Sequence, residues 1–213
     1  MQNGSNWRPL MELILYYMPG TRAERIRWIL KELDLDYRIE TIDLFKGEGQ
    51  RADYLAIHPL GQLPALKVDG EVMFESGAIV QWLAESVPGS NLAPAPDHSA
   101  RRAFNQWMYF AVTSLETPAW EMMLHGSILP DKQAVKAIVP FAEQRYVLAL
   151  GVLEKAVQGQ DYLVDGRFSA ADIMVGYILA WFPELLVPYP GLQTYLARLK
   201  QRPAYPRAPN EGL

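Results

Sequence analysis

The hydrophobic pattern of this chain changes its period at one proline-rich segment, residues 88–96, which reads PGSNLAPAP. Short apolar runs typical of strands occur only before this segment. After it, apolar residues recur every three or four positions, as they do in helices. Segments rich in proline and glycine between such regions are typical of linkers. The sequence therefore predicts a small α/β domain over residues 12–89, followed by an all-helical domain over residues 97–213.

The first region contains short segments with the period of a strand or a helix, in the order β-α-β-α-β-β-α. They are residues 13–17, 21–33, 37–43, 52–57, 65–68, 72–74 and 76–87. The first segment is apolar throughout, which is typical of a strand buried on both faces. The β-α-β opening predicts a parallel strand pair, and Asp69-Gly70 between two apolar runs predicts a hairpin. One small α/β sandwich accounts for this order.

The second region shows only helical patterns, over residues 97–125, 133–157, 170–182 and 190–200. Asp97 stands where the N-cap of the first helix would be. Pro118 and Pro140 lie within two of these patterns, and we expect them to kink or interrupt the helices because proline lacks the backbone donor. Ser169 and Asp172 have the spacing of a capping box, which we interpret as purely structural.

The composition excludes several classes of function. The chain has 20 Lys and Arg residues against 24 Asp and Glu, a net charge of −4, whereas proteins that bind nucleic-acid phosphates need a basic surface. It has no cysteine, which excludes disulfides, thiolate metal sites and thioredoxin- or glutaredoxin-type chemistry by a protein thiol. Its three histidines lack the spacing of metal ligands, so no metal site is expected.

The sequence shows neither a membrane-spanning run nor a signal-peptide pattern, and its expected location follows from this. No apolar run reaches the ~18 residues that a membrane span needs, so no membrane association is expected. Residues 1–11 do not show the basic-then-apolar pattern of a signal peptide. We interpret them as a short extension, with Met11 as an alternative start, and we expect the protein to be cytoplasmic.

Four motifs occur in the order and register of one known family. They are HPLGQLPAL at 58–66, similar to N-P-x-G-K-V-P-x-L; ESGAI at 75–79, similar to E-S-x-A-I; GRFSAADI at 166–173, similar to G-x-x-[ST]-x-A-D; and RPA at 202–204. Over about residues 12–207 the chain thus resembles the cytosolic glutathione transferases. His58 replaces the usual Asn of the first motif, a difference that concerns a local turn contact.

This resemblance implies both a fold and partners. It implies a thioredoxin-like α/β domain that binds glutathione as a co-substrate, and an all-helical domain that contributes a pocket for a small hydrophobic electrophile. Met18 and Met108 are candidates for lining that pocket. The resemblance also implies a homodimer, in which the first domain of one subunit packs on the second domain of the other.

The residues before the third strand are Gln62, Leu63 and Pro64. A proline is tolerated there because the start of a strand can lack one N–H donor. The residues alone leave open whether this segment is a structural turn or a peptide-binding edge. By resemblance, the Leu63–Pro64 bond is cis, the Leu63 backbone pairs with the cysteinyl residue of glutathione, and Gln62 and Leu63 belong to the glutathione site.

Glu75 and Ser76 stand at the predicted start of a helix, where backbone N–H groups and the helix dipole favour a carboxylate. By resemblance, Ser76 and these amides hold the α-carboxylate of the γ-glutamyl group, and Glu75 accepts from its ammonium. Alternatively, Ser76 is only an N-cap. The two roles are compatible because they use the same end of the helix.

Thr21 is the candidate catalytic residue, because it follows the first strand and begins the first helix. Its surroundings, Pro-Gly-Thr-Arg-Ala, resemble the Pro-Gly-Ser-Arg-Ala of serine-type bacterial members, with Thr in place of Ser. Two alternatives stay open. Thr21 and Glu24 also have the spacing of a capping box, so Thr21 could be only a cap. Tyr17 could instead supply the hydroxyl that activates the thiol.

The function that we expect is that of a glutathione transferase. A free thiol with a pKa of ~8.5 is mostly protonated at neutral pH, so the enzyme must favour the thiolate. Conjugation, dehalogenation, peroxide reduction and isomerisation all begin with that thiolate, and the sequence names neither the reaction nor the electrophile. The alternative is a non-catalytic regulatory or scaffold protein with the same fold.

Overall fold

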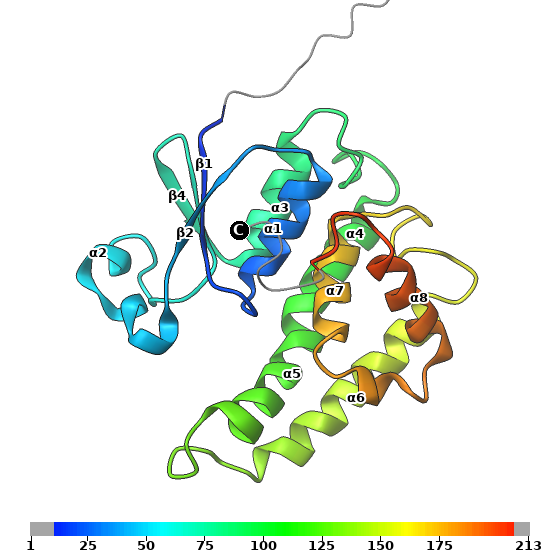
Figure 1. Cartoon of the computed structure of the whole chain (residues 1–213). Coiled ribbons are helices and arrows are strands. Elements are labelled where there is room, and N and C mark those ends of the chain that lie inside the picture. Colours follow the sequence, from blue (N-terminus) through cyan, green and yellow to red (C-terminus); the bar gives the residue numbers. More distant parts are fainter. Residues whose placement is uncertain (1–10, 207–213) are drawn as a thin grey trace, which may run out of the picture. The chain divides into compact units, whose positions relative to one another are not determined.

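The computed structural model describes residues 11–206. Residues 1–10 and 207–213 lie outside the described part, and with them most of the expected N-terminal extension and the end of the expected second domain. The chain divides into two compact units, one containing the residues up to Ser90 and the other Asn91–Tyr205. Each unit is described separately below (Figure 1).

The first unit is built on a mixed four-stranded sheet in the order β2-β1-β3-β4. Its strands are β1 (Leu13–Tyr17), β2 (Arg38–Thr41), β3 (Ala65–Val68) and β4 (Glu71–Phe74). β1 pairs with β2 in parallel and with β3 antiparallel, and β3 and β4 form the predicted hairpin. All five residues of β1 are buried, as its continuous apolar sequence predicts.

Helices cover both faces of this sheet. α1 (Ala23–Glu32) and α3 (Ser76–Ser86) pack against each other on one face, and α2 (Ala52–Leu55) lies on the other (Figure 1). The loop after α2 contains Gly61, with φ of 62°, where an added Cβ would lie only 2.3 Å from the carbonyl oxygen of Gly49. Glycine is therefore required at this position of the predicted motif, because any side chain would push the two segments apart.

The second unit is entirely helical. Its α-helices are α4 (Arg101–Phe110), α5 (Glu116–Met123), α6 (Ile138–Ala156), α7 (Ala170–Leu179) and α8 (Pro190–Lys200). Asp97 is not an N-cap, because α4 begins only at Arg101, with Ala100 as its N-cap residue. The pattern predicted as one helix over 97–125 instead contains two π-helical turns.

The two prolines fall where helices begin. Pro118 lies in the first turn of α5, directly after the π-helical turn Ala111–Leu115, and Pro140 lies in the first turn of α6. The first turn of α6 tolerates Pro140, because the N–H groups there have no partner within the helix, whereas Pro118 follows a π-helical turn in a helical run that continues through it. The predicted interruption is thus confirmed at Pro118, while Pro140 belongs to a helix start.

A buried capping box begins α7, as the sequence predicts. Asp172, which has no exposed surface, accepts from the Ser169 amide at 2.8 Å and from its hydroxyl at 3.0 Å. It also accepts from the Leu163 amide at 3.0 Å and from the Tyr195 hydroxyl at 2.8 Å. Both carboxylate oxygens are therefore used to join α7, α8 and the loop before them, which is a structural role.

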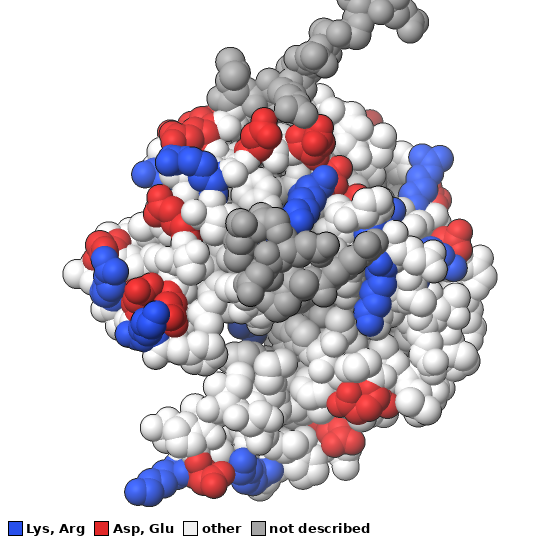
Figure 2. All heavy atoms as spheres, viewed as in Figure 1, with Lys and Arg blue, Asp and Glu red and all other residues white. Residues whose placement is uncertain are grey.

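The surface mixes charges of both signs. On the face that Figure 2 shows, basic and acidic side chains are interspersed. Exposed pairs such as Arg38–Glu12 and Arg51–Asp53 fit this pattern. Among the helices of residues 11–206, none has the length and apolar character that crossing a bilayer would require.

Candidate functional site

The strand register brings the sequence-predicted residues to one end of the sheet. Tyr16 of β1 pairs with Ala65 of β3, and Ala65 pairs in turn with Phe74 of β4. Because β3 is antiparallel to both neighbours, its start lies beside the ends of β1 and β4. The segments containing Thr21, Gln62-Leu63 and Glu75-Ser76 adjoin these strand ends. Three segments distant in the sequence therefore meet around one place.

The segment before β3 presents its backbone there. The Leu63–Pro64 bond is cis, as expected. The Tyr54 hydroxyl donates to the Gln62 carbonyl at 2.6 Å, and the Leu63 side chain is buried in a cluster with Tyr16 and Tyr54. Within residues 11–206, neither the N–H nor the C=O of Leu63 takes part in a backbone hydrogen bond. Leu63 is thus anchored by its side chain while its backbone remains available to an extended peptide.

His58 replaces the asparagine of the related motif without loss of the turn. Its Nδ1 accepts from the Leu60 amide at 3.3 Å, and its ring packs on Phe74 with centroids 5.0 Å apart. Burial lowers the pKa of His58, which favours the neutral ring that this acceptor role needs. The local turn contact is therefore made by an imidazole.

The start of α3 combines a strained residue with a buried hydroxyl. Glu75 is the N-cap residue and has φ of 72°, a left-handed conformation that costs a non-glycine residue on the order of 1–3 kcal/mol and is concentrated at ligand sites. Ser76 is the first helical residue rather than the N-cap, and only 6% of its surface is exposed. The helix end thus offers one exposed carboxylate and one sheltered hydroxyl.

Arg25 is a residue of this site that sequence reasoning missed. It belongs to α1, has no exposed surface, and donates from Nη1 to the Ser76 hydroxyl at 3.0 Å. A buried guanidinium beside a helix N-terminus adds positive charge where an anion would bind. The sequence signal is slight: Arg25 and Arg27 stand between apolar residues of an otherwise buried helix.

Thr21 lies in the turn between β1 and α1 and is half-buried. Its hydroxyl donates to the Met18 carbonyl at 2.7 Å and accepts from the Ala23 amide at 3.3 Å. The capping box expected with Glu24 is not formed, since α1 begins at Ala23 with Arg22 as N-cap residue. The reason is that the Glu24 carboxylate turns the other way, toward Tyr17.

Tyr17 ends β1 and is wholly buried. Its hydroxyl donates to Oε1 of Glu24 in a short hydrogen bond and accepts from Nη1 of Arg27 at 2.7 Å. Burial and the Glu24 carboxylate raise the pKa of Tyr17 well above its usual value. Tyr16 faces the opposite side of the sheet, where its ring lies 5.8 Å from that of Tyr54. The Tyr17 proton is thus already held by a carboxylate.

Comparison with known proteins bears on both units. The family model for the glutathione S-transferase N-terminal domain matches residues 11–85, and the model for the C-terminal domain matches residues 97–208. The chain belongs to the glutathione S-transferase family. The first match includes every predicted residue of the glutathione site and Thr21, and the second includes the capping box of α7.

Two relatives of this glutathione S-transferase family member are named for different activities. The disulfide-bond oxidoreductase YfcG of Escherichia coli K12 is 30% identical over 204 residues, or 89% of this chain and 91% of the relative. Glutathione S-transferase GstA of E. coli O157:H7 is 27% identical over 197 residues, or 89% of this chain and 93% of the relative. The family therefore includes close relatives named for different reactions.

Solved structures of related proteins have the same fold. A glutathione transferase from Methylococcus capsulatus str. Bath is 30% identical, with a TM-score of 0.81 over 91% of this chain and 95% of that one. A glutathione transferase homologue from Sulfitobacter, solved with bound glutathione, has a TM-score of 0.80 over 91% of this chain and 95% of its own. Its identity is 23%, so it shows the fold alone.

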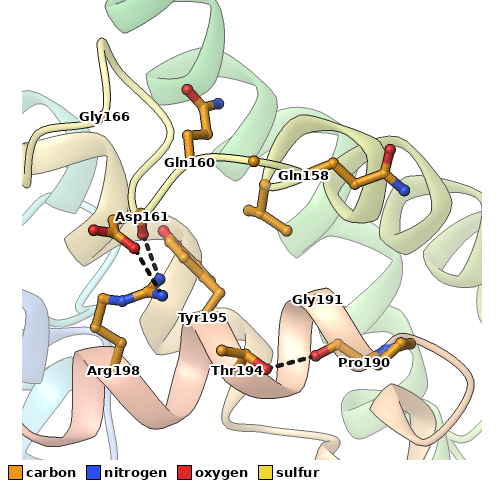
Figure 3. A pocket seen from close by; sticks show the side chains of 11 residues that line it. Gln158, Gln160, Asp161, Gly166, Pro190, Gly191, Thr194, Tyr195 and Arg198 are labelled. Carbon is orange, nitrogen blue, oxygen red and sulfur yellow. Dashed lines mark hydrogen bonds and ion pairs between the residues drawn. The ribbon is translucent and has the colours of Figure 1, made fainter.

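The second unit of this family member contains a cavity of about 700 Å³ beside the start of α8 (Figure 3). None of the sequence-predicted site residues lines it. Its charged groups satisfy each other, because Arg198 pairs with the Asp161 carboxylate at 2.9 Å and with the Asp161 carbonyl at 2.8 Å. Within residues 11–206, no three His, Asp or Glu side chains come together as metal ligands would. The sheet end described above, by contrast, gathers groups suited to a peptide ligand.

Proposed function

We propose that this protein binds glutathione at the end of the sheet and activates its thiol as a thiolate that attacks small electrophiles. The observation that carries the proposal is the convergence there of the unpaired Leu63 backbone, the start of α3 and Thr21. Glutathione is an extended peptide with a carboxylate and an ammonium at one end and a thiol in its middle. Its peptide backbone suits the Leu63 segment, its charged end suits the start of α3, and its thiol suits Thr21.

Each segment has a proposed part in binding. The Leu63 N–H and C=O pair with the cysteinyl residue as a neighbouring strand would, and the exposed Gln62 amide lies next to them. Ser76 and the first amides of α3 hold the γ-glutamyl carboxylate, aided by the Arg25 charge. The exposed Glu75 carboxylate accepts from the ammonium. Because the carboxylate and the ammonium carry opposite charges and meet different protein groups, they fix the direction in which glutathione binds.

Thr21 is the proposed donor to the thiolate. A hydroxyl has one proton and can rotate, so the proton now donated to the Met18 carbonyl can turn to the sulfur when glutathione binds. The hydrogen bond from the Ala23 amide is compatible with that rotation, because it uses a lone pair of the Thr21 oxygen and not its proton. Tyr17 is the weaker candidate, since its proton is held by Glu24 inside the fold. Capping and catalysis by Thr21 are therefore compatible.

The reaction begins with loss of the thiol proton to solvent. In a conjugation, the sulfur electron pair then forms a bond to an electrophilic carbon, and the displaced pair leaves with the leaving group or moves onto the acceptor. The name of YfcG adds disulfide reduction to the candidate reactions. Since this chain has no cysteine, both electrons for such a reduction must come from glutathione sulfurs. The small electrophile and a cytoplasmic location stay predictions.

A homodimer is part of the proposal. Large apolar side chains lie exposed on β4, at Val72 and Phe74, and along one stripe of α6, at Phe141, Leu148 and Val152. Residues spaced by seven and four share a helix face, and exposed apolar patches of this kind are typical of protein interfaces. Sedimentation should show about twice the 24.1 kDa chain mass, and Leu148→Glu should shift it toward one chain mass. A wild-type species of one chain mass at micromolar concentration contradicts the dimer.

Calorimetric titration with glutathione tests the binding proposal. Ser76→Ala and Glu75→Ala should each weaken binding by ~1–3 kcal/mol, the loss expected for a charge-assisted hydrogen bond. Ser90→Ala is the matched control, because that serine bonds the Ala84 carbonyl at the other end of α3, and it should bind as wild type does. A folded wild type that does not bind glutathione would favour the scaffold alternative.

A further inference from the structure

We infer that Glu24 is a positioning residue for Thr21, holding the turn that carries the Thr21 hydroxyl toward the glutathione sulfur. The inference rests on the proposed function and adds to it a residue outside the ligand site. Glu24 was predicted only as half of a capping box, and the structure gives its carboxylate different partners.

The Glu24 carboxylate is bonded on both sides of the turn. Before the turn, the Tyr17 hydroxyl donates to Oε1. After the turn, Nη1 of Arg27 lies 3.5 Å from Oε2. One side chain thus joins the end of β1 to the body of α1, on either side of the turn that contains Thr21.

The Glu24 backbone closes the same turn. Its amide donates to the Thr21 carbonyl at 3.1 Å, and the Thr21 amide donates to the Met18 carbonyl at 3.3 Å. Thr21 is therefore held through its own carbonyl by one buried residue, whose side chain also bonds the strand before the turn. A catalytic donor must lie within about 3 Å of the atom it serves, so a small displacement of this turn would weaken its bond to sulfur.

The identity of the side chain supports a specific role. Only 4% of the Glu24 surface is exposed, and burying a carboxylate is unfavourable unless its partners compensate. Burial raises the pKa of Glu24 against the opposing effects of Tyr17, Arg27 and Gly20. An apolar residue would fill the same space without that cost, but it could neither accept from Tyr17 nor pair with Arg27.

Glu24→Gln distinguishes the bonding role of the Glu24 carboxylate from simple filling of space, because the two side chains have nearly the same size. Oε1 of the carboxylate accepts from Tyr17 and Oε2 faces the Arg27 guanidinium at 3.5 Å, whereas an amide has one oxygen and one NH₂ group, so its NH₂ would face either the Tyr17 donor or the arginine cation. We expect the apparent pKa of the bound glutathione thiol to rise by about half a unit or more and kcat to fall ~3- to 10-fold. The glutathione Kd should stay within about two-fold of wild type, because Ser76 and Leu63 are untouched.

Asp172→Asn is the matched control, because Asp172 is also a buried carboxylate in the first turn of a helix. Both variants should lose thermal stability, but only Glu24→Gln should move the thiol pKa, followed by thiolate absorbance against pH. Should Glu24→Gln fail to fold, Glu24→Asp retracts the carboxylate by one methylene and should raise the thiol pKa in the same way.

The outcomes separate the two proposals. A wild type that binds glutathione, together with a Glu24 variant whose thiol pKa is unchanged, overturns the role of Glu24 alone. Equal shifts in the Glu24 and Asp172 variants overturn it too, because they would reflect general destabilisation. Absence of glutathione binding by the wild type overturns the proposed function, and the role of Glu24 with it.

Discussion

The carboxylates of Glu24 and Asp172 both lie buried in the first turn of a helix, and they bond in opposite directions. Asp172 turns back to the start of its own helix, where Ser169 donates with both amide and hydroxyl. Glu24 turns away from the start of α1 to the end of the preceding strand, where Tyr17 donates. The same sequence spacing, a hydroxyl residue three positions before a carboxylate, thus begins two different structures.

The difference separates a structural helix start from one that serves a site. At α7, the Ser169 hydroxyl is consumed by the capping box, and the segment is fixed in one arrangement. At α1, the Thr21 hydroxyl donates its single proton to the Met18 carbonyl and accepts from the Ala23 amide. The proton can be redirected to another acceptor while the bond from the amide is kept. Stability at α1 comes instead from Glu24, which leaves Thr21 for chemistry.

The largest expected difference between the two helix starts is in activity. Thr21→Val keeps the shape of the side chain and removes the donor, so turnover with an electrophile that the wild type accepts should fall ~100-fold, the lower end of the effect of losing one donor to a developing or stabilised anion. Ser169→Ala removes the corresponding hydroxyl at α7 and should leave turnover per folded molecule unchanged. Steady-state rates of purified variants measure both. Equal losses would contradict the comparison.

The next largest effect is on stability, where substitutions at the start of α7 should cost more than those at the start of α1. Asp172→Asn places one NH₂ group against donors that now surround two oxygens, so the free energy of unfolding should fall by ~1–3 kcal/mol. Ser169→Ala should lose ~1–2 kcal/mol, because it opens a buried box, and Thr21→Val only ~0.5–1 kcal/mol. Urea unfolding with a common m-value measures all three. A greater loss for Thr21→Val than for Ser169→Ala would show that Thr21 is chiefly a cap.

The smallest effect is a change in the pH dependence of stability. Burial raises the pKa of Asp172 above its usual value of 3.8, so the folded state binds this proton more readily than the unfolded chain. The resulting stability is complete below pH 3.8 and is lost as the pH rises through the raised folded value. Because asparagine does not titrate, the cost of Asp172→Asn should shrink as the pH rises above about 4. Parallel unfolding curves against pH would contradict this.

Much of the fold follows from local sequence. The apolar run 13–17, the Asp69-Gly70 hairpin and the box at Ser169 are each specified by neighbouring residues, and the structure confirms them. The start of α4 at Arg101 was missed, because Asp97 has the right residue type in a segment that simply continues as turns. Local patterns thus predicted the existence of the helices and strands better than the residues at which they begin.

The side-chain partners within the site could not be predicted in the same way. Whether Glu24 bonds Thr21 or Tyr17 depends on where β1 places the tyrosine relative to α1, which is a tertiary contact. The bond from Arg25 to Ser76 joins residues 51 positions apart on two helices. Family resemblance named Gln62, Leu63, Glu75 and Ser76, but it did not indicate these buried arginine and glutamate partners.

The most direct test of the account is the apparent pKa of the glutathione thiol when bound, followed by thiolate absorbance across pH. Thr21→Val should raise this pKa toward the ~8.5 of a free thiol. Thr21→Ser keeps the hydroxyl and should match the wild type, and Tyr17→Phe should raise the thiol pKa less than Thr21→Val does, because Arg27 still pairs with Glu24. If Tyr17→Phe raises the thiol pKa and Thr21→Val does not, Tyr17 is the activating hydroxyl and Thr21 is only a cap.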